Sequence, residues 1–537
     1  MTGVAYDYVV VGGGSAGCVA AAELAADPRN KVLLLECGDP AEAHPETLRA
    51  DGYKDAFVND DLIWERFSAP QPGCRGQRVF LGSGTGLGGS GSVNGMVYTR
   101  GAALDYDAWP AGWRWRDLVP DFEHLERALR PRRRAPTAFT ETCLAAATAV
   151  GFRHSEDLND GDLSGVLGYE WMNYEGDRRR SSYVAFLHER PPSPNLRIAT
   201  RARAHRLELD ETRRVTAVLY EESGRLQRAA VRREVLLAAG ALETPKLLML
   251  SGIGPGHVLR AASVPVVLDR GAVGRNLHDH PNVPLFFLGR RPVDCFYPQL
   301  YGFHRANPAL PLPPRQSDTC YVFYPARSSL KEATKRILPG LLLPERWYRP
   351  STRRLVRLAL DGVYATHALD ALIERLYGIV VILGKPLSRG AVTLRSDRPD
   401  APARLDPAYF EARADLDTMV RGVQLARRIA RAAPLAAWGN LALHPLARVA
   451  TDAQVAAWIE RNAITTYHYA GTCRMGDDEA SVVDPRTRLR GVANVRIADA
   501  SIIPFTPVSA MNAPSMVAGL RAARFAMEEA RAASLSA

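Results

Sequence analysis

The pattern of apolar and polar positions near the amino terminus predicts a strand, a tight turn and a helix. A β-branched apolar run at residues 8–11 leads into glycines, and an alanine-rich stretch follows at residues 19–26. Short apolar runs bounded by glycine are typical of buried strands, and alanine is the strongest helix former. A second apolar run, KVLLLECG at residues 31–38, comes after the predicted helix and contains Glu36 near its end.

Two later stretches also carry a regular pattern. The sequence NLRIATRARAHRLELD, which begins at Asn195, alternates apolar and polar residues and predicts a half-exposed strand. Residues 346–378, RWYRPSTRRLVRLALDGVYATHALDALIERLYG, have the spacing of amphipathic helices with a basic amino-terminal half. Nowhere does an apolar run reach the roughly 18 residues that a membrane-spanning helix needs.

Length, charge and cysteine content narrow the class of protein. The 537 residues exceed one ordinary core and predict two or more domains. The net charge is +10, but the arginines are scattered without an aromatic-interleaved stripe, so we expect no nucleic-acid partner. The seven cysteines are dispersed and form no C-x-x-C pair, which favours free thiols in a reducing compartment. The amino terminus lacks the features of a secretory signal, and we predict a soluble, cytoplasmic protein.

The glycines of the first turn fit a dinucleotide-binding motif. Gly12, Gly14 and Gly17 match G-x-G-x-x-G between the predicted strand and helix. The first glycine allows the turn, the second lets the backbone approach a pyrophosphate, and the third lets the helix pack on the strand. Glu36 lies where a carboxylate accepts the ribose hydroxyls, which favours FAD or NAD over NADP. The motif does not separate FAD from NAD.

A glycine-rich stretch at residues 81–101 helps to decide between FAD and NAD as the cofactor. It has eight glycines in 21 residues, a density that lets the backbone lie flat against a ligand. Its apolar residues Val93, Met96, Val97 and Tyr98 do not suit a solvated linker and favour a buried loop against a flat cofactor.

Several motifs resemble one family. LGGSGSVNGMVYTRG, at residues 87–101, resembles the first signature of the glucose–methanol–choline (GMC) oxidoreductases, FAD enzymes that oxidise alcohols. GALETPKLLMLSGIGP, at residues 240–255, resembles the second signature. VGRNLHDHP, YHYAGTCRMG and VRIADASIIP also resemble family motifs and follow in the family's order.

The resemblance implies an α/β fold with a Rossmann-like FAD-binding domain and an α+β substrate domain around an antiparallel sheet. We expect a discontinuous FAD domain over residues 1–152, 190–285 and 462–537, and a substrate domain over residues 153–189 and 286–461. The strand from Asn195 looks like the family strand that meets the adenine, and the stretch from Gly378 looks like strands of the substrate sheet. The implied FAD contacts are Gly12, Gly14, Ser15, Gly17, Glu36, Gly89, Ser92, Asn94, Gly95, Met96, Val97, Ala204, Asp499, Ala500 and Asn512.

The scarce histidine in TTYHYAGTCRMGDD, His468, is the candidate catalytic residue. Alcohol oxidation needs an acceptor for the hydroxyl proton, and histidine is the side chain whose ordinary pKa lies near working pH. A lone histidine is more often a core residue, but His468 occupies the position of the family's catalytic base, and we predict that role for it. The family's second catalytic position is Ala510 here, which leaves Asn512 or Ser509 as the compensating group.

Other positions depart from the family pattern. Residues 83–85, Ser-Gly-Thr, stand where the family often has Arg-Gly-Lys, and Gly91 replaces a signature serine. Some members attach flavin through a histidine where this chain has Val93, so we predict non-covalent FAD. His278 and His280 are conceivable metal ligands, but the resemblance assigns them to a structural turn, and we predict no metal site. His205 and His444 are interpreted as structural.

These features together predict an FAD-dependent oxidase or dehydrogenase, choline dehydrogenase-like, that acts on a small-molecule alcohol. Oxygen, a quinone or a protein would accept the electrons. The alternatives are a flavin-retaining lyase, like the hydroxynitrile lyases on this fold, and a flavin-binding protein with little catalysis. For residues 346–378, packing over the substrate entrance is the favoured interpretation, and docking to a membrane surface or an electron-accepting partner is the second.

Overall fold

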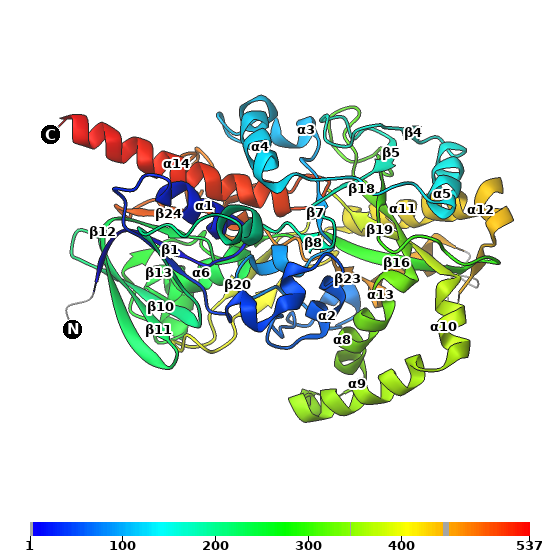
Figure 1. Ribbon diagram of the computed structural model, residues 1–537, viewed down its shortest axis with the longest axis horizontal. Helices are drawn as coiled ribbons and strands as arrows, with labels where there is room; N and C mark the ends of the chain where they lie inside the picture. Colours follow the sequence, from blue (N-terminus) through cyan, green and yellow to red (C-terminus); the bar gives the residue numbers. More distant parts are fainter. Residues whose placement is uncertain (1–3, 344, 444–450, 537) are drawn as a thin grey trace.

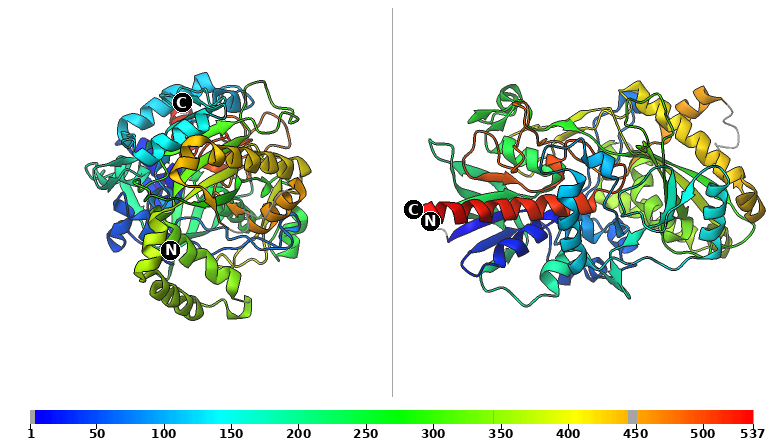
Figure 2. Two further views of the ribbon diagram at one scale, coloured as in Figure 1. Left: turned by 90° about the vertical axis from the view of Figure 1, so that its right-hand side faces the viewer. Right: turned by 90° about the horizontal axis from the view of Figure 1, so that it is seen from above.

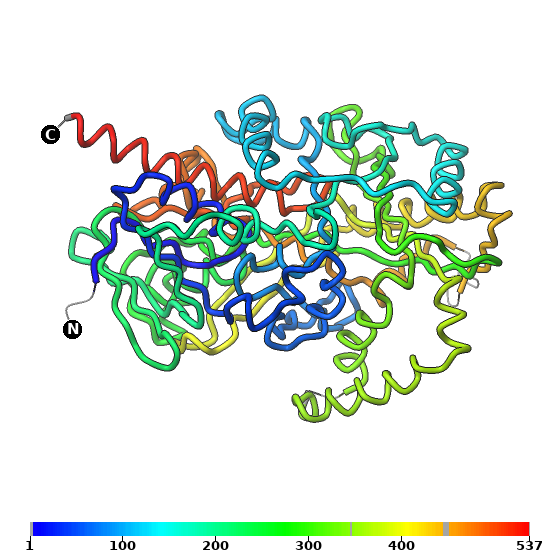
Figure 3. The backbone as a smooth tube through the Cα atoms, in the orientation of Figure 1, coloured from blue at the N-terminus to red at the C-terminus, as the bar shows by residue number. Residues whose placement is uncertain are grey.

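The computed structural model describes residues 4–343, 345–443 and 451–536, and the chain folds around two large sheets that lie toward opposite ends of its long axis (Figure 1). His444 lies outside the described residues. Both termini lie at the end of the molecule that holds the first sheet (Figure 3). Segments far apart in the sequence contribute to each sheet, so neither sheet is built from one continuous stretch of chain.

The first sheet has seven strands in the order β10-β11-β12-β1-β2-β9, with β24 beside β12. Its strands are β1 (Ala5–Val11), β2 (Val32–Leu35), β9 (Leu196–Ala199), β10 (Ala202–Leu209), β11 (Val215–Glu222), β12 (Arg225–Leu237) and β24 (Val495–Ile497). β1 pairs in parallel with β2 and β12, and β2 pairs in parallel with β9. Strand β2 is buried along its whole length, as expected for a parallel strand that is covered on both faces.

Helix α1 (Ser15–Ala25) follows β1 and packs against the carboxyl-terminal helix α14 (Asn512–Ser536), as Figure 2 shows. The two helices come so close that a Cβ atom on Gly519 would lie 2.3 Å from the carbonyl oxygen of Ala16. The predicted strand, turn and helix at the amino terminus are therefore confirmed. The single strand predicted from Asn195 is wrong. The chain turns at Arg201, whose φ is +51°, and forms β9 beside β2 and β10 beside β11.

The second sheet has eight strands in the order β22-β16-β19-β18-β17-β5-β4, with β23 beside β16. Its strands are β4 (Arg153–His154), β5 (Val166–Tyr169), β16 (Pro281–Leu288), β17 (Leu300–His304), β18 (Thr319–Pro325), β19 (Leu376–Leu383), β22 (Leu441–Ala442) and β23 (Ile464–Thr465). All pairs except β4–β5 are antiparallel. Of the strands predicted from Gly378 onward, only β19 joins this sheet. β20 (Gly390–Thr393) and β21 (Arg404–Asp406) form a separate sheet with β15 (Arg275–Leu277), which corrects that prediction.

Helices cover one face of the second sheet and leave the other face to a cavity. On the covered face, α5 (Ala138–Thr148) contacts β4 and β5, and α11 (Arg413–Arg431) contacts β18 and β19. Helices α12 (Ala433–Trp438) and α13 (Asp452–Asn462) pack against α11. Alternate residues of a strand point to opposite faces. Val283 and Leu285 of β16 are therefore core residues, whereas Asn282, Pro284 and Phe286 line the cavity.

Three helices project from the body beside the second sheet (Figure 1): α8 (Leu330–Leu342), α9 (Pro350–Tyr364) and α10 (His367–Glu374). Helices α9 and α10 confirm the amphipathic helices predicted over residues 346–378, whereas α8 precedes that stretch. The remaining helices are α2 (Tyr53–Val58), α3 (Ala103–Tyr106), α4 (Trp115–Leu129), α6 (Gly240–Leu250) and α7 (Gly256–Ala261). In the part of the chain that the structure describes, no helix combines the length and apolar character needed to cross a bilayer.

Candidate active site

A cavity of about 840 Å³ lies between the two sheets. At one end it is lined by residues that follow the carboxyl ends of three parallel strands: Gly12 after β1, Glu36 after β2 and Asp499 after β24. This edge of an open α/β sheet is where ligands ordinarily bind. At the other end the wall is the uncovered face of the second sheet. The volume falls within the range of about 300–1,000 Å³ that is typical of small-molecule and cofactor sites.

The first glycine turn is shaped for close backbone approach. Gly12 has a φ of +106°, and a Cβ atom there would lie 2.5 Å from the carbonyl oxygen of Ala238. A Cβ atom on Gly17 would lie 1.8 Å from the carbonyl oxygen of Gly12, so only glycine lets α1 pack on this turn. Gly14 precedes α1, lines the cavity and has open space where a side chain would be. No side chain caps α1, which leaves its first N–H groups to a ligand.

Glu36 joins three glycine-containing segments at the edge of the cavity. Its carboxylate accepts hydrogen bonds from the backbone N–H groups of Gly13 at 2.8 Å, Gly38 at 2.8 Å and Gly86 at 3.0 Å. The Cys37 thiol also donates to Oε1, at 3.4 Å, whereas Oε2 accepts from Gly13 and keeps a lone pair for a ligand hydroxyl. The acid predicted to meet a ribose therefore also holds the nucleotide end of the cavity together.

The loop at residues 87–101 is held by an arginine that sequence analysis missed. Arg179 is completely buried and donates to the side-chain oxygen of Asn94 at 2.8 Å, to its backbone oxygen at 2.7 Å and to the backbone oxygen of Gly91 at 3.1 Å. Burial lowers the pKa of Arg179 to about 10, so it stays charged. This arginine fixes Asn94 and leaves Gly95, which has open space on its Cβ side, facing the cavity.

Most of the predicted cofactor residues meet at this cavity. The residues that line it are Gly12, Gly14, Ser15, Glu36, Gly89, Asn94, Gly95, Val97, Ala204, Asp499, Ala500 and Asn512. Gly17, Ser92 and Met96 are not among the lining residues. Ser92 is buried and donates to the carbonyl oxygen of Leu87 at 2.8 Å, and Met96 packs in a small cluster with Tyr53 and Met172. These two residues hold the loop in shape from behind.

His468 lines the same cavity, in the loop after β23. Its backbone N–H donates to Asp279 at 2.7 Å, and the other carboxylate oxygen of Asp279 accepts from the hydroxyls of Thr465, at 2.5 Å, and Tyr409. Tyr467 has a φ of +64°, a conformation that is uncommon outside glycine and recurs at active sites. Burial lowers the pKa of His468 to about 4, so its imidazole is neutral at physiological pH.

The second histidine at the site, His280, was interpreted from the sequence as part of a structural turn, and this interpretation is incomplete. The Nδ1 atoms of His280 and His468 are 3.0 Å apart, and both rings line the cavity. Burial, and then the neighbouring His468, lower the pKa of His280 well below its usual value. The two residues are 188 positions apart, so no local spacing could reveal the pair; the pairing depends on β23 lying beside β16.

The cavity also contains an acid that sequence analysis missed. Glu170 follows β5, is completely buried, and neither of its carboxyl oxygens has a hydrogen-bond partner in the protein. Burial raises the pKa of Glu170 well above its usual value, which favours the neutral carboxylic acid. Ala510 lines the cavity without a polar group, and the buried hydroxyl of the neighbouring Ser509 has no partner either.

Two profiles of the GMC oxidoreductase family match residues 6–282 and 386–519. The chain belongs to the GMC oxidoreductase family. It is 32% identical to an alcohol dehydrogenase (acceptor) of Pseudomonas putida over 99% of this chain and 97% of that protein. It is 31% identical to an oxygen-dependent choline dehydrogenase of Sinorhizobium fredii over 96% of this chain and 94% of that protein. A crystal structure of pyridoxine 4-oxidase from Mesorbium loti superposes with a TM-score of 0.82 and 26% sequence identity, and the match covers 97% of this chain and 98% of that one.

GMC membership confirms the predicted fold and the predicted cofactor, FAD: the protein is an FAD-dependent oxidoreductase of alcohols. The residues present fit the cofactor. Gly14, Gly95 and Gly240 all line the cavity and have open space on their Cβ sides, which gives a flat ligand access to the backbone. Asp499 is held by Gly240 N–H at 2.9 Å and Thr244 hydroxyl at 2.5 Å. Among the described residues no cluster of three or more His, Cys, Asp or Glu could hold a metal ion.

Proposed function

We propose that this GMC protein oxidises an alcohol to a carbonyl compound, with His468 as the acceptor of the hydroxyl proton. When bound, FAD supplies the redox chemistry, taking up the hydrogen and electron pair that leave the alcohol carbon. The observation that carries the proposal is the position of His468: a neutral imidazole on the wall of the cavity that also contains the predicted FAD contacts. A neutral imidazole can accept a proton, whereas a charged one cannot.

Asp279 and His280 are proposed to position the base. Asp279 binds the backbone of His468 and therefore fixes the loop. For His468 to present a free Nε2 lone pair to the substrate, its proton must lie on Nδ1 and point at the Nδ1 atom of His280, 3.0 Å away. The burial that keeps His468 neutral makes its protonated form costly. The hydrogen bond to His280 opposes that cost, because it is stronger when the donor is charged.

The substrate is proposed to lie against the uncovered face of the second sheet. That face presents apolar side chains such as Phe286 and Val322. Glu170 adds one polar group, and as a neutral acid it can donate a hydrogen bond to the substrate away from the reacting carbon. The same proposal includes an FAD domain over residues 1–152, 190–285 and 462–537 and a substrate domain over residues 153–189 and 286–461. It also includes non-covalent binding of FAD. The electron acceptor is oxygen, a quinone or a protein.

An anaerobic screen of alcohols, followed at the visible flavin band, tests the proposed function. An alcohol substrate should bleach the oxidised flavin, because the electrons have no other acceptor. A flavin-retaining lyase would convert its substrate while the spectrum stays yellow, and that result would overturn the proposal. Once a substrate is found, oxygen uptake with and without an artificial acceptor separates an oxidase from a dehydrogenase.

A further inference from the structure

The projecting helices carry a concentration of exposed apolar side chains. Of the seventeen large hydrophobic residues that are exposed in the described part of the chain, seven lie in the short stretch from residue 341 to residue 372. They are Leu341, Leu342, Trp347, Leu355, Leu358, Val363 and Leu372. Exposed apolar residues are ordinarily scattered singly over a surface, so a cluster of this kind indicates a contact surface.

Helix α9 is amphipathic, and its polar side is turned inward. Leu355, Leu358 and Val363 are 66%, 57% and 54% exposed, and their spacing of three and five residues places them on one outward face. On the opposite face, Arg353 is buried and Arg357 is half-buried. A surface helix of a protein that stays free in water has the reverse orientation.

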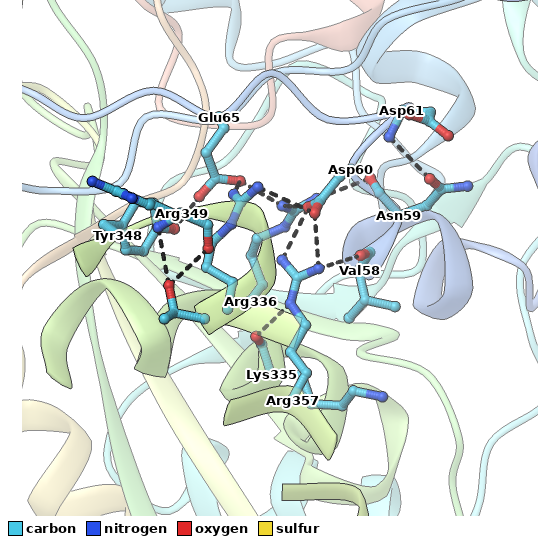
Figure 4. Close-up of polar contacts among 12 residues, drawn as sticks. Val58, Asn59, Asp60, Asp61, Glu65, Lys335, Arg336, Tyr348, Arg349 and Arg357 are labelled. Atoms are coloured by element: carbon cyan, nitrogen blue, oxygen red, sulfur yellow. Dashed lines mark hydrogen bonds and ion pairs between the residues drawn. The ribbon is translucent and has the colours of Figure 1, made fainter. Parts of the chain in front are cut away.

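An ion-pair cluster fixes this orientation. Figure 4 shows Arg357 directed at Asp60, which it meets at 3.0 and 3.1 Å. Arg353 pairs with Glu65 at 2.7 Å, and Arg336 of α8, whose side chain is completely buried, pairs with both carboxylates at 2.6 Å. Turning α9 over to bury its leucines would break the ion pairs of Arg353 and Arg357 with these carboxylates, which opposes that rotation. The outward apolar face is therefore built into the fold.

We propose that this face, called here the α9 face and formed by Leu355, Leu358 and Val363 with Trp347 beside it, docks on an anionic phospholipid surface. Between residues 341 and 372, the exposed charged residues that the structure describes are Arg346, Arg349, Arg354 and Asp370, and the half-buried Asp361 is paired with Lys335 at 2.8 Å. Leucine and tryptophan flanked by arginine are the composition of helices that lie in the bilayer interface. In a contact with a second copy, the two-fold symmetry would bring these arginines together, which disfavours that partner.

Helix α8 lies between α9 and the cavity. Ile337, Leu338 and Leu341 of α8 line the cavity, and Leu341 is also 66% exposed. Helix α9 packs against α8. A lipid surface docked on the α9 face would therefore be separated from the cavity by α8, whose Leu341 is both exposed and part of the cavity wall.

Vesicle co-sedimentation of the flavin-loaded protein tests the proposal. Vesicles of phosphatidylglycerol and phosphatidylcholine should pellet the wild type, and phosphatidylcholine alone should pellet much less of it. Leu355→Gln with Leu358→Gln should abolish the pelleting. Replacing Arg346, Arg349 and Arg354 with Gln should weaken binding to the anionic vesicles by about a hundredfold, since each arginine near such a surface contributes about a factor of five.

The matched control is Leu226→Gln with Leu441→Gln. These leucines are 55% and 66% exposed and lie outside the projecting helices, so this variant should bind as the wild type does. Each variant should keep its flavin spectrum, because none of the substituted residues lines the cavity. Wild-type protein that does not pellet with anionic vesicles, or that forms dimers which Leu355→Gln with Leu358→Gln dissociates, would overturn the proposal.

Discussion

Replacement of His280 by leucine should slow flavin reduction by the alcohol without removing the flavin. The Nδ1 atoms of His280 and His468 are 3.0 Å apart, within hydrogen-bond distance, and both rings are enclosed by the protein. Leucine leaves the Nδ1–H of His468 without this acceptor at the moment when the ring gains a proton. A hydrogen bond to a charged group contributes about 1.5–3 kcal/mol, so the rate should fall about 10- to 150-fold.

The assay is anaerobic stopped-flow reduction of the bound flavin at saturating alcohol. His280→Asn is the control, because an amide oxygen can accept the same hydrogen bond, and it should restore part of the lost rate. Loss in both variants would point to a packing role for His280. A leucine variant that reduces its flavin at the wild-type rate would refute the assignment of His280 as a positioning residue.

Three further predictions concern the same cavity. Because the pKa of His468 is about 4, the imidazole is about 97% neutral at pH 5.5, whereas a histidine of ordinary pKa 6.5 would be about 9% neutral. The rate of flavin reduction should therefore stay constant down to pH 5.5 and fall as the pH drops through about 4. A tenfold loss of rate by pH 5.5 would contradict the assignment. Glu170→Leu should raise Tm, since it removes a buried acid without partners, and should lower kcat/KM about 2- to 10-fold. Glu170→Gln should keep a kcat/KM near that of the wild type. A glutamine variant as impaired as the leucine variant would show that a charged or proton-donating acid is required. Mild acid precipitation should release the flavin into the supernatant, because Val93 cannot form the covalent link that histidine forms, and colour that stays in the pellet would show a covalent bond elsewhere.

Local patterns in the sequence were sufficient to predict which residues form the nucleotide end of the cavity. Gly12, Gly14 and Gly17 act through backbone geometry within one turn, and Glu36 follows the next strand, so the chemistry and the spacing are readable from the sequence alone. The extended pattern from Asn195 misled because alternation reports which residues are half-buried and does not report a turn. The chain bends at Arg201 through a positive φ that its sequence does not require, and β9 and β10 continue in the same direction in different parts of the sheet.

The rest of the site depends on contacts between distant segments. His280 meets His468 because β23 pairs with β16, and Arg179 meets Asn94 across 85 residues. Glu170 appears in the sequence as an ordinary acid, and only the burial of its carboxyl group in the cavity gives it significance. The family resemblance led to the prediction of His468 as proton acceptor and of the loop at residues 87–101 as a flavin contact. It did not identify the residues that hold them in place.

The most direct test of the proposed chemistry is the rate at which an alcohol substrate reduces the flavin in His468→Ala under anaerobic conditions. The variant should bind FAD with an unchanged oxidised spectrum, because the predicted FAD contacts remain. Its flavin should be reduced at least about a hundredfold more slowly than in the wild type, the lower end of what general-base catalysis contributes. Reduction at the wild-type rate in a variant that retains its flavin would contradict the account.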